Sequence, residues 1–143
     1  MNQTTPTIST EVVGFAPLDE SGCLGLLGFE DVGRLGLSSG ALPVVMPVRY
    51  RLIGRSAVFA TEAGAKLTSA RRGAVACLEI DGSDPSTGTT WTVLATGRLR
   101  VVADATVTSS AADLPLRAWG LPSAEHFVAL DIALLSGSTS KTE

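Results

Sequence analysis

Residues 42–53 alternate between apolar and other side chains with a period of two. The even positions of this segment are all apolar: Leu42, Val44, Met46, Val48, Tyr50 and Leu52. Because successive side chains of a strand point to opposite faces, this pattern predicts one long strand with one buried face. Pro43 and Pro47 both fall on the odd positions and remove N–H donors from the same side of the strand. We therefore expect an edge that is unpaired, bulged or turned toward a ligand.

Five further segments show strand patterns bounded by turn residues. They are residues 32–37, 57–61, 75–80, 91–103 and 126–135. Gly97 is expected to mark a bulge. Short helices are predicted over 18–29, capped by Asp19, over the segment that ends at Gly73, and over 109–119. A polar loop is expected over 81–90. Six strands without regular strand–helix alternation predict a mainly β fold, an antiparallel barrel with a few short helices.

The 143 residues are read as one domain. Residues 1–16 are expected to form a loose lead-in, 17–137 the barrel domain, and 138–143 a disordered polar tail. The predicted strands 91–103 and 126–135 carry apolar residues on both faces, so one face needs cover from a helix or a second subunit.

Basic residues are concentrated in one part of an otherwise acidic chain, whose formal net charge is −3. Six of the eleven Lys and Arg lie between positions 49 and 72: Arg49, Arg51, Arg55, Lys66, Arg71 and Arg72. This cluster is short and lacks interleaved aromatic residues, which argues against nucleic acid as the partner. Cys23, Cys77 and the single histidine, His126, lack the spacing of a metal site, and the cysteines are expected to be free thiols.

No apolar run approaches the ~20 residues that a membrane-spanning helix requires. The polar N-terminus also lacks the pattern of a secretory signal. A soluble, cytoplasmic protein without membrane contact is therefore expected. No nucleophile–base arrangement is visible, so we assign no catalytic residue.

The strand that ends at Thr61 leads through Gly64 into a helix that carries Lys66. N–H groups and the dipole at a helix start favour an anion, and a hydroxyl and an ammonium suit a phosphate. This segment therefore predicts a site for a phosphorylated cofactor. The alternatives are a solvated helix lysine for Lys66 and solvated helix-end charges for Arg71 and Arg72.

The order of several short motifs resembles the pyridoxamine 5′-phosphate oxidase-like, FMN-binding split-barrel family, and in particular its short bacterial members of the nitroimidazole-resistance type. The resemblance runs from Leu18 to Gly137. It rests on Val32-Gly33-Arg34-Leu35-Gly36, Pro47-Val48-Arg49-Tyr50, Phe59-Ala60-Thr61, Gly64-Ala65-Lys66-Leu67, Trp91-Thr92-Val93 through Gly97, and Leu135-Ser136-Gly137.

This resemblance implies a six-stranded split barrel that binds FMN between the two subunits of a homodimer. Pro47, Val48, Arg49 and Tyr50 would then lie along the isoalloxazine. Thr61 and Lys66 would hold the phosphate, with Ala60 offering backbone contacts and Leu67 belonging to the same motif. Trp91 and Thr92 would face the cofactor region.

Some of these residues also have simpler interpretations. Trp91 is typical of a core or interface anchor, Tyr50 of a core residue and Arg49 of a solvated strand residue. His126 fits a surface or interface role, and Glu79 has no assigned role. Relatives often carry arginines where this chain has Ala129 and Ser138.

The function implied is an FMN-dependent oxidoreductase that passes electrons or hydride to a small-molecule acceptor. The cofactor would perform the transfer, while the protein supplies binding and orientation. The alternatives are a non-catalytic flavin-binding or sensing module, and the same fold with a deazaflavin or haem.

Overall fold

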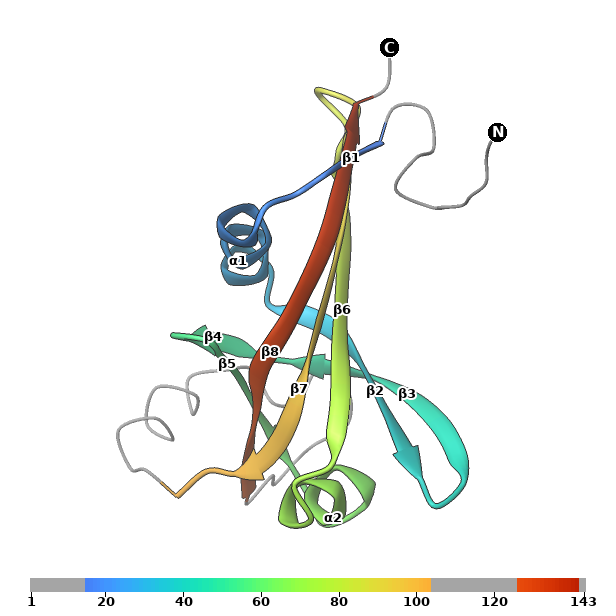
Figure 1. The fold of residues 1–143 in the computed structure, drawn as a ribbon, viewed down its shortest axis with the longest axis vertical. Helices are drawn as coiled ribbons and strands as arrows, with labels where there is room; N and C mark the ends of the chain where they lie inside the picture. Colours follow the sequence, from blue (N-terminus) through green and yellow to red (C-terminus); the bar gives the residue numbers. More distant parts are fainter. Residues whose placement is uncertain (1–14, 104–125, 142–143) are drawn as a thin grey trace.

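The computed structural model describes residues 15–103 and 126–141 (Figure 1). Two short helices and eight strands follow one another along these residues. In chain order they are β1 (Phe15–Pro17), α1 (Glu20–Phe29), β2 (Val32–Ser39), β3 (Leu42–Arg49), β4 (Arg51–Ile53), β5 (Ser56–Thr61), α2 (Ala65–Arg71), β6 (Val75–Asp84), β7 (Thr89–Val101) and β8 (His126–Lys141).

The strands form one antiparallel sheet in the order β3-β2-β6-β7-β8-β5-β4, and β1 pairs with β8. The two end strands, β3 and β4, are consecutive in the chain and are separated only by Tyr50. The sheet must therefore curl until its ends meet, which makes it a barrel. Pairing is continuous around this barrel except between the end strands β3 and β4, and β3 also contacts β5 without pairing with it. The predicted fold class, a mainly β antiparallel barrel with short helices, is confirmed, but the predicted number of six strands is wrong, because the short strands β1 and β4 are additional members of the sheet.

Tyr50 stabilises the junction between the end strands β3 and β4. Its side chain is 1% exposed, and its hydroxyl donates to the Leu27 carbonyl oxygen over 2.6 Å. Its backbone N–H donates to the Asp31 carbonyl oxygen over 3.0 Å. Burial raises the pKa of the Tyr50 phenol above its usual range, so the hydroxyl remains a donor. Tyr50 thus ties the junction of β3 and β4 to the end of α1 and the segment that follows it.

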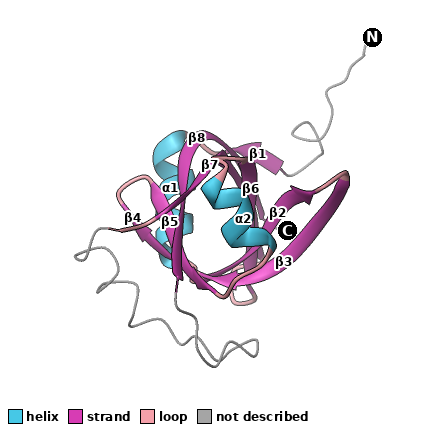
Figure 2. Cartoon of the chain, turned by 90° about the horizontal axis from the view of Figure 1, so that it is seen from below, coloured by secondary structure: helices cyan, strands magenta, loops and turns pink. Residues whose placement is uncertain are grey.

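The barrel interior is filled by the inward-facing side chains of every long strand. The largest of these that are fully buried include Phe59, Leu35, Leu78, Ile80, Leu99 and Leu130. Helix α2 lies across one mouth, as Figure 2 shows from below, and contributes Leu67 and Ala70 to the core. Helix α1 lies against the outside and buries Cys23 and Leu27.

Several local predictions are confirmed. Asp19 caps α1 and accepts from the Gly22 N–H over 2.7 Å. β3, which carries both strand prolines, lies at the end of the sheet order, where one side needs no N–H donors. The register of β7 against β8 shifts between Thr96 and Gly97, so the predicted bulge is present.

Other predictions were wrong. Residues 42–53 do not form one strand, because the chain bends at Tyr50 to close the barrel, so β4 is separate. The predicted loop 81–90 is shorter, because β6 and β7 pair out to Asp84 and Thr89. β1 begins within the predicted lead-in 1–16. The predicted disordered tail was also wrong for residues 138–141, since β8 continues to Lys141 and pairs with β1 and β7, while residues 142–143 lie outside the described part of the chain. The helix predicted over 109–119 lies outside the described residues.

Candidate functional site

The basic cluster separates into paired and unpaired cations. Arg49 forms an ion pair with Asp31, with Nη1 and Oδ2 3.1 Å apart, and Arg55 pairs with Glu20. Lys66 forms no ion pair within the described residues, although its side chain is half-buried. Burial lowers the pKa of the Lys66 ammonium from its ordinary value, and nearby Glu62 only partly opposes this shift. Lys66 is therefore a desolvated cation that an anion would stabilise.

Thr61 ends β5, five residues before Lys66, which lies in the first turn of α2. Its side chain is 2% exposed, and its hydroxyl donates to the Glu62 carbonyl oxygen over 2.9 Å. A phosphate would take this donor only after the hydroxyl had rotated. Ala60 is also buried, so only its backbone could meet a ligand. α2 has seven residues and no side-chain cap at Gly64, so the lysine side chain rather than the helix start is the stronger feature.

The segment 47–50 presents only alternate side chains to the outside. Pro47 is exposed and Arg49 is partly exposed, whereas Val48 and Tyr50 are buried in the core. β3 contacts β5, the strand that ends at Thr61. Val48 and Tyr50 could therefore meet a ligand only through their backbone, and the core interpretation of Tyr50 holds.

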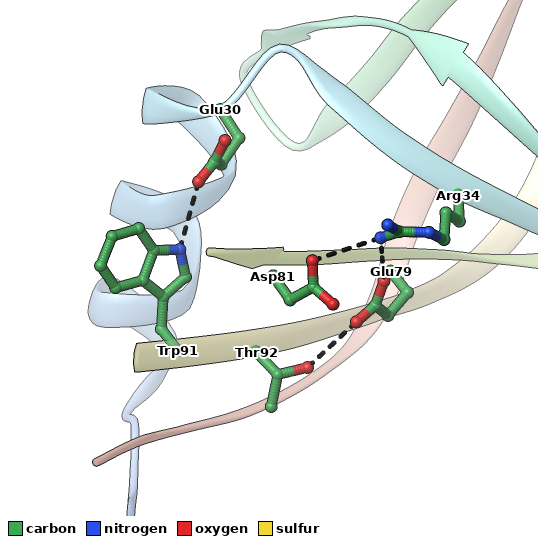
Figure 3. A network of polar contacts seen from close by, with 6 residues as sticks. All are labelled: Glu30, Arg34, Glu79, Asp81, Trp91 and Thr92. Carbon is green, nitrogen blue, oxygen red and sulfur yellow. Dashed lines mark hydrogen bonds and ion pairs between the residues drawn. The ribbon is translucent and has the colours of Figure 1, made fainter. Parts of the chain in front are cut away.

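Trp91 and Thr92 are neighbours in β7, so their side chains point to opposite faces of the sheet, and each makes its own polar contact (Figure 3). Trp91 Nε1 donates to Glu30 Oε2 over 3.2 Å, and its ring meets the Phe29 ring edge-on at 6.5 Å. Thr92 Oγ1 donates to Glu79 Oε2 over 3.3 Å. The indole is thus anchored to the residue that follows α1.

Arg34 joins Glu79 and Thr92 in a polar network on the outer face of the sheet. Its Nη1 lies 3.2 Å from Glu79 Oε1 and 3.2 Å from Asp81 Oδ1. Both carboxylates raise the pKa of the Arg34 guanidinium, with Asp81 contributing most. Sequence reasoning gave no role to these residues. The available signal was the i, i+2 spacing of Glu79 and Asp81, which places both acids on one face of a strand.

The predicted site residues do not all meet within one chain. Trp91 and Thr92 lie near the hairpin end of β7, whereas α2 packs near its other end, where Arg98 Nη1 donates to the Gly73 carbonyl oxygen over 2.9 Å. Seven residues of strand separate Trp91 from Arg98, or about 23 Å. Within one chain, Thr61 and Lys66 are close along the sequence and β3 contacts the strand that ends at Thr61, whereas Trp91 lies far from the end of β7 where α2 packs.

Exposed apolar side chains cluster on the outer face that carries the network. Among the exposed large apolar residues of the described chain are Val45, Val75, Leu94 and Leu134. Val75 and Leu94 line a groove of about 510 Å³ with Val45 and the half-buried Cys77. Both Cys77 and the buried Cys23 are free thiols.

Ala129 and Ser138 both lie in β8. Ala129 is fully buried in a small cluster with Val58 and Val102, where a charged side chain would be strongly disfavoured. Ser138 lies in β8 opposite Thr92. His126 starts β8 directly opposite Thr61 and is half-exposed.

Two classes of feature are missing from the described residues. No helix there is long and apolar enough to cross a membrane. No group of three or more His, Cys, Asp or Glu side chains in residues 15–103 and 126–141 is arranged to hold a metal ion.

Comparison with known proteins relates this chain to one family. A family profile described as pyridoxamine 5′-phosphate oxidase matches residues 19–139. The uncharacterized protein Rv0080 of Mycobacterium tuberculosis is 35% identical over 105 residues, which are 70% of this chain and 67% of that protein.

Solved structures share the fold. The FAD binding protein from Mycobacterium smegmatis superposes with a TM-score of 0.69 and 24% identity, covering 88% of this chain and 98% of that one. A FAD-binding protein from Mesorhizobium loti gives a TM-score of 0.71 and 20% identity, with coverage of 88% and 98%. At these identities the likeness concerns the fold.

Proposed function

This chain belongs to the pyridoxamine 5′-phosphate oxidase-like family, and on that premise we propose that it binds FMN and works as an oxidoreductase. The observation that carries the proposal is Lys66, a half-buried ammonium that lies outside every ion pair of the described residues. A phosphate dianion would supply the missing partner through a charge-assisted hydrogen bond. Thr61, at the end of the neighbouring strand, would add a hydroxyl donor.

The rest of the cofactor would lie along the seam of the barrel. The outward side chains of Pro47 and Arg49, and the backbone of Val48 and Tyr50, border the gap between β3 and β5. The ion pair with Asp31 and the hydrogen bonds of Tyr50 hold this segment still. A bound flavin would supply transfer of a hydride or single electrons, while these residues orient it and exclude water on one side.

We further propose that two copies of the chain complete the site. Trp91 lies about 23 Å along β7 from the end where α2 packs, so the Trp91 and Thr92 of one copy would serve a flavin held by Lys66 of the other. The exposed apolar side chains Val45, Val75 and Leu134 supply a face for this contact. A particle of one 14.7 kDa chain with flavin bound, seen by light scattering, would contradict the arrangement.

The proposal is tested by an absorption spectrum, a flavin titration and a turnover assay. Protein purified under mild conditions should be yellow or become yellow with added FMN, and mass spectrometry should identify the released ligand. FAD should be titrated in parallel, because two similar structures are named as FAD-binding. Colourless protein that ignores both flavins would refute the proposal. Bound flavin without oxidation of a reduced nicotinamide, in the presence of small acceptors, would favour a flavin-binding module.

The lowered pKa of Lys66 predicts an alkaline loss of FMN affinity. Phosphate binding requires the charged ammonium, whose pKa in the free protein lies below the ordinary 10.5. The dissociation constant of FMN should therefore rise as pH increases through this lowered pKa, by up to about tenfold per pH unit. The free protein should respond in the opposite sense, because the unfolded chain binds more protons than the folded one in this window, so folding stability increases with pH.

Two controls isolate the lysine. Lys66→Arg keeps its charge at these pH values and should lose the alkaline effect, while riboflavin, which has no phosphate, should show none. The same pH dependence in wild type and Lys66→Arg would show that another group is responsible.

A further inference from the structure

A second groove adjoins Thr92, on the face of the sheet away from the barrel core. It encloses about 400 Å³ between β7, β8 and the segment that joins β1 to α1. Eight described residues line it: Pro17, Leu18, Thr92, Leu94, Leu135, Ser136, Gly137 and Ser138. From this lining we infer that the groove binds an uncharged small molecule with an apolar body and one or two polar groups.

The inference of an uncharged ligand rests on the absence of charged side chains among the residues that line the groove. None of the eight lining residues has a charged side chain. Thr92 contacts the network of Arg34, Glu79 and Asp81, in which one guanidinium faces two carboxylates and leaves a net charge of −1. A phosphate or carboxylate in the groove would lose water without gaining a cation.

A positively charged ligand would also lack a partner in the groove. Arg34 and Thr92 already engage the Glu79 carboxylate, and Asp81 is engaged by Arg34. No carboxylate lines the groove itself. An ammonium would therefore also be desolvated without a direct partner, which leaves the uncharged class.

The polar atoms of the groove suit a neutral ligand. The Thr92 hydroxyl donates its hydrogen bond to Glu79 Oε2. The lone pairs of its oxygen can therefore accept a hydrogen bond from a ligand. Ser136 and Ser138 add hydroxyls along one wall, while Leu18, Leu94 and Leu135 supply apolar surface. A mainly apolar concave site with a few convergent polar groups is the usual form of a small-molecule site.

In the proposed oxidoreductase, Thr92 also faces the cofactor, so this groove would hold the electron donor or acceptor beside the flavin. The assignment of the groove to the reaction thus rests on the proposed function, whereas its preference for uncharged ligands does not.

The test uses three probes that share a nitrophenyl ring: 4-nitrobenzyl alcohol, 4-nitrobenzoate and 4-nitrobenzylamine. Their dissociation constants are measured by equilibrium dialysis on the intact chain, with and without FMN. We expect the alcohol to bind at least about tenfold more tightly than either charged probe. Equal or tighter binding of the carboxylate or the amine would overturn the inference.

A charge placed at the groove shows where the probes bind. Ser136 is exposed at its rim, so Ser136→Arg should fold and should tighten 4-nitrobenzoate binding several-fold. Ala133→Arg is the matched control, since Ala133 is exposed on the same strand but lies outside the groove, and it should leave all three constants unchanged. Leu94→Trp, which fills the groove, should weaken alcohol binding. A folded Ser136→Arg protein, verified by circular dichroism, with wild-type constants would overturn the assignment.

Failure of the two proposals can be told apart. Protein that binds no flavin yet selects the neutral probe would remove the proposed function and keep the groove. Protein that binds FMN but does not select the neutral probe would remove only the groove.

Discussion

Replacing Lys66 with alanine is expected to weaken FMN binding by about tenfold to 150-fold, which corresponds to about 1.5–3 kcal/mol for a hydrogen bond to a charged group. The lysine is half-buried and outside every ion pair of the described residues, so the phosphate would be its main partner. Fluorescence titration of FMN against wild type and variant gives the two dissociation constants. The free energy of unfolding should not decrease, because the substitution removes the desolvation cost of the charge and breaks no ion pair of the described residues.

The effect should be specific to the phosphate and to this side chain. Lys66→Ala should leave riboflavin binding almost unchanged. Arg71→Ala, in the same helix but at its exposed end, should leave FMN binding within about twofold, because exposed helix-end charges contribute little. An equal loss for FMN and riboflavin, or an equal loss in Arg71→Ala, would contradict a phosphate contact at Lys66.

Replacing Gly97 with alanine is expected to destabilise the protein by about 3–5 kcal/mol or to prevent folding, among the largest effects of a single substitution. A Cβ atom at this position would lie 1.8 Å from the Asp131 carbonyl oxygen, 2.8 Å from its carbonyl carbon and 3.2 Å from Ile132 Cα. All three are backbone atoms of β8 at the bulge, so no side chain can move away. Urea unfolding followed by circular dichroism measures the loss.

Gly25→Ala is the matched control. Gly25 lies inside α1, and no heavy atom would come within 4 Å of an added Cβ. Alanine there should stabilise the protein by about 0.5–1 kcal/mol, because glycine loses more backbone entropy in a helix. A mild effect of Gly97→Ala, comparable to that of Gly25→Ala, would mean that the β7–β8 bulge is looser than described.

Local patterns were sufficient to predict much of the fold. The alternation over 42–53, the two prolines on one parity and the glycine at 97 each report on their own strand, so the inward face, the edge and the bulge follow from the sequence. The ends of β6 and β8 could not be predicted in this way. Residues 81–84 and 138–141 carry turn-forming or hydroxyl side chains, and they are strands because they pair with partners distant in sequence.

The candidate site also contains residues that are close in sequence and residues that only the pairing of distant strands brings together. Thr61 and Lys66 are five residues apart on one strand-to-helix connection, so their proximity is local. The network of Arg34 with Glu79 requires β2 to pair with β6 across 45 positions, which no short motif encodes. Lys66 also became informative only when its burial and the pairing of the neighbouring arginines were known.

The position of β8 has a consequence for how the chain is made. This last strand lies in the interior of the sheet order, where it pairs with β7 and β5 and also receives β1 from the other terminus. During synthesis, β5 and β7 emerge from the ribosome before their shared partner exists. Until then both strands present open edges on which another chain could add. The barrel therefore closes only after residues 126–141 have been made, and a nascent chain stopped before His126 would be a candidate for chaperone binding.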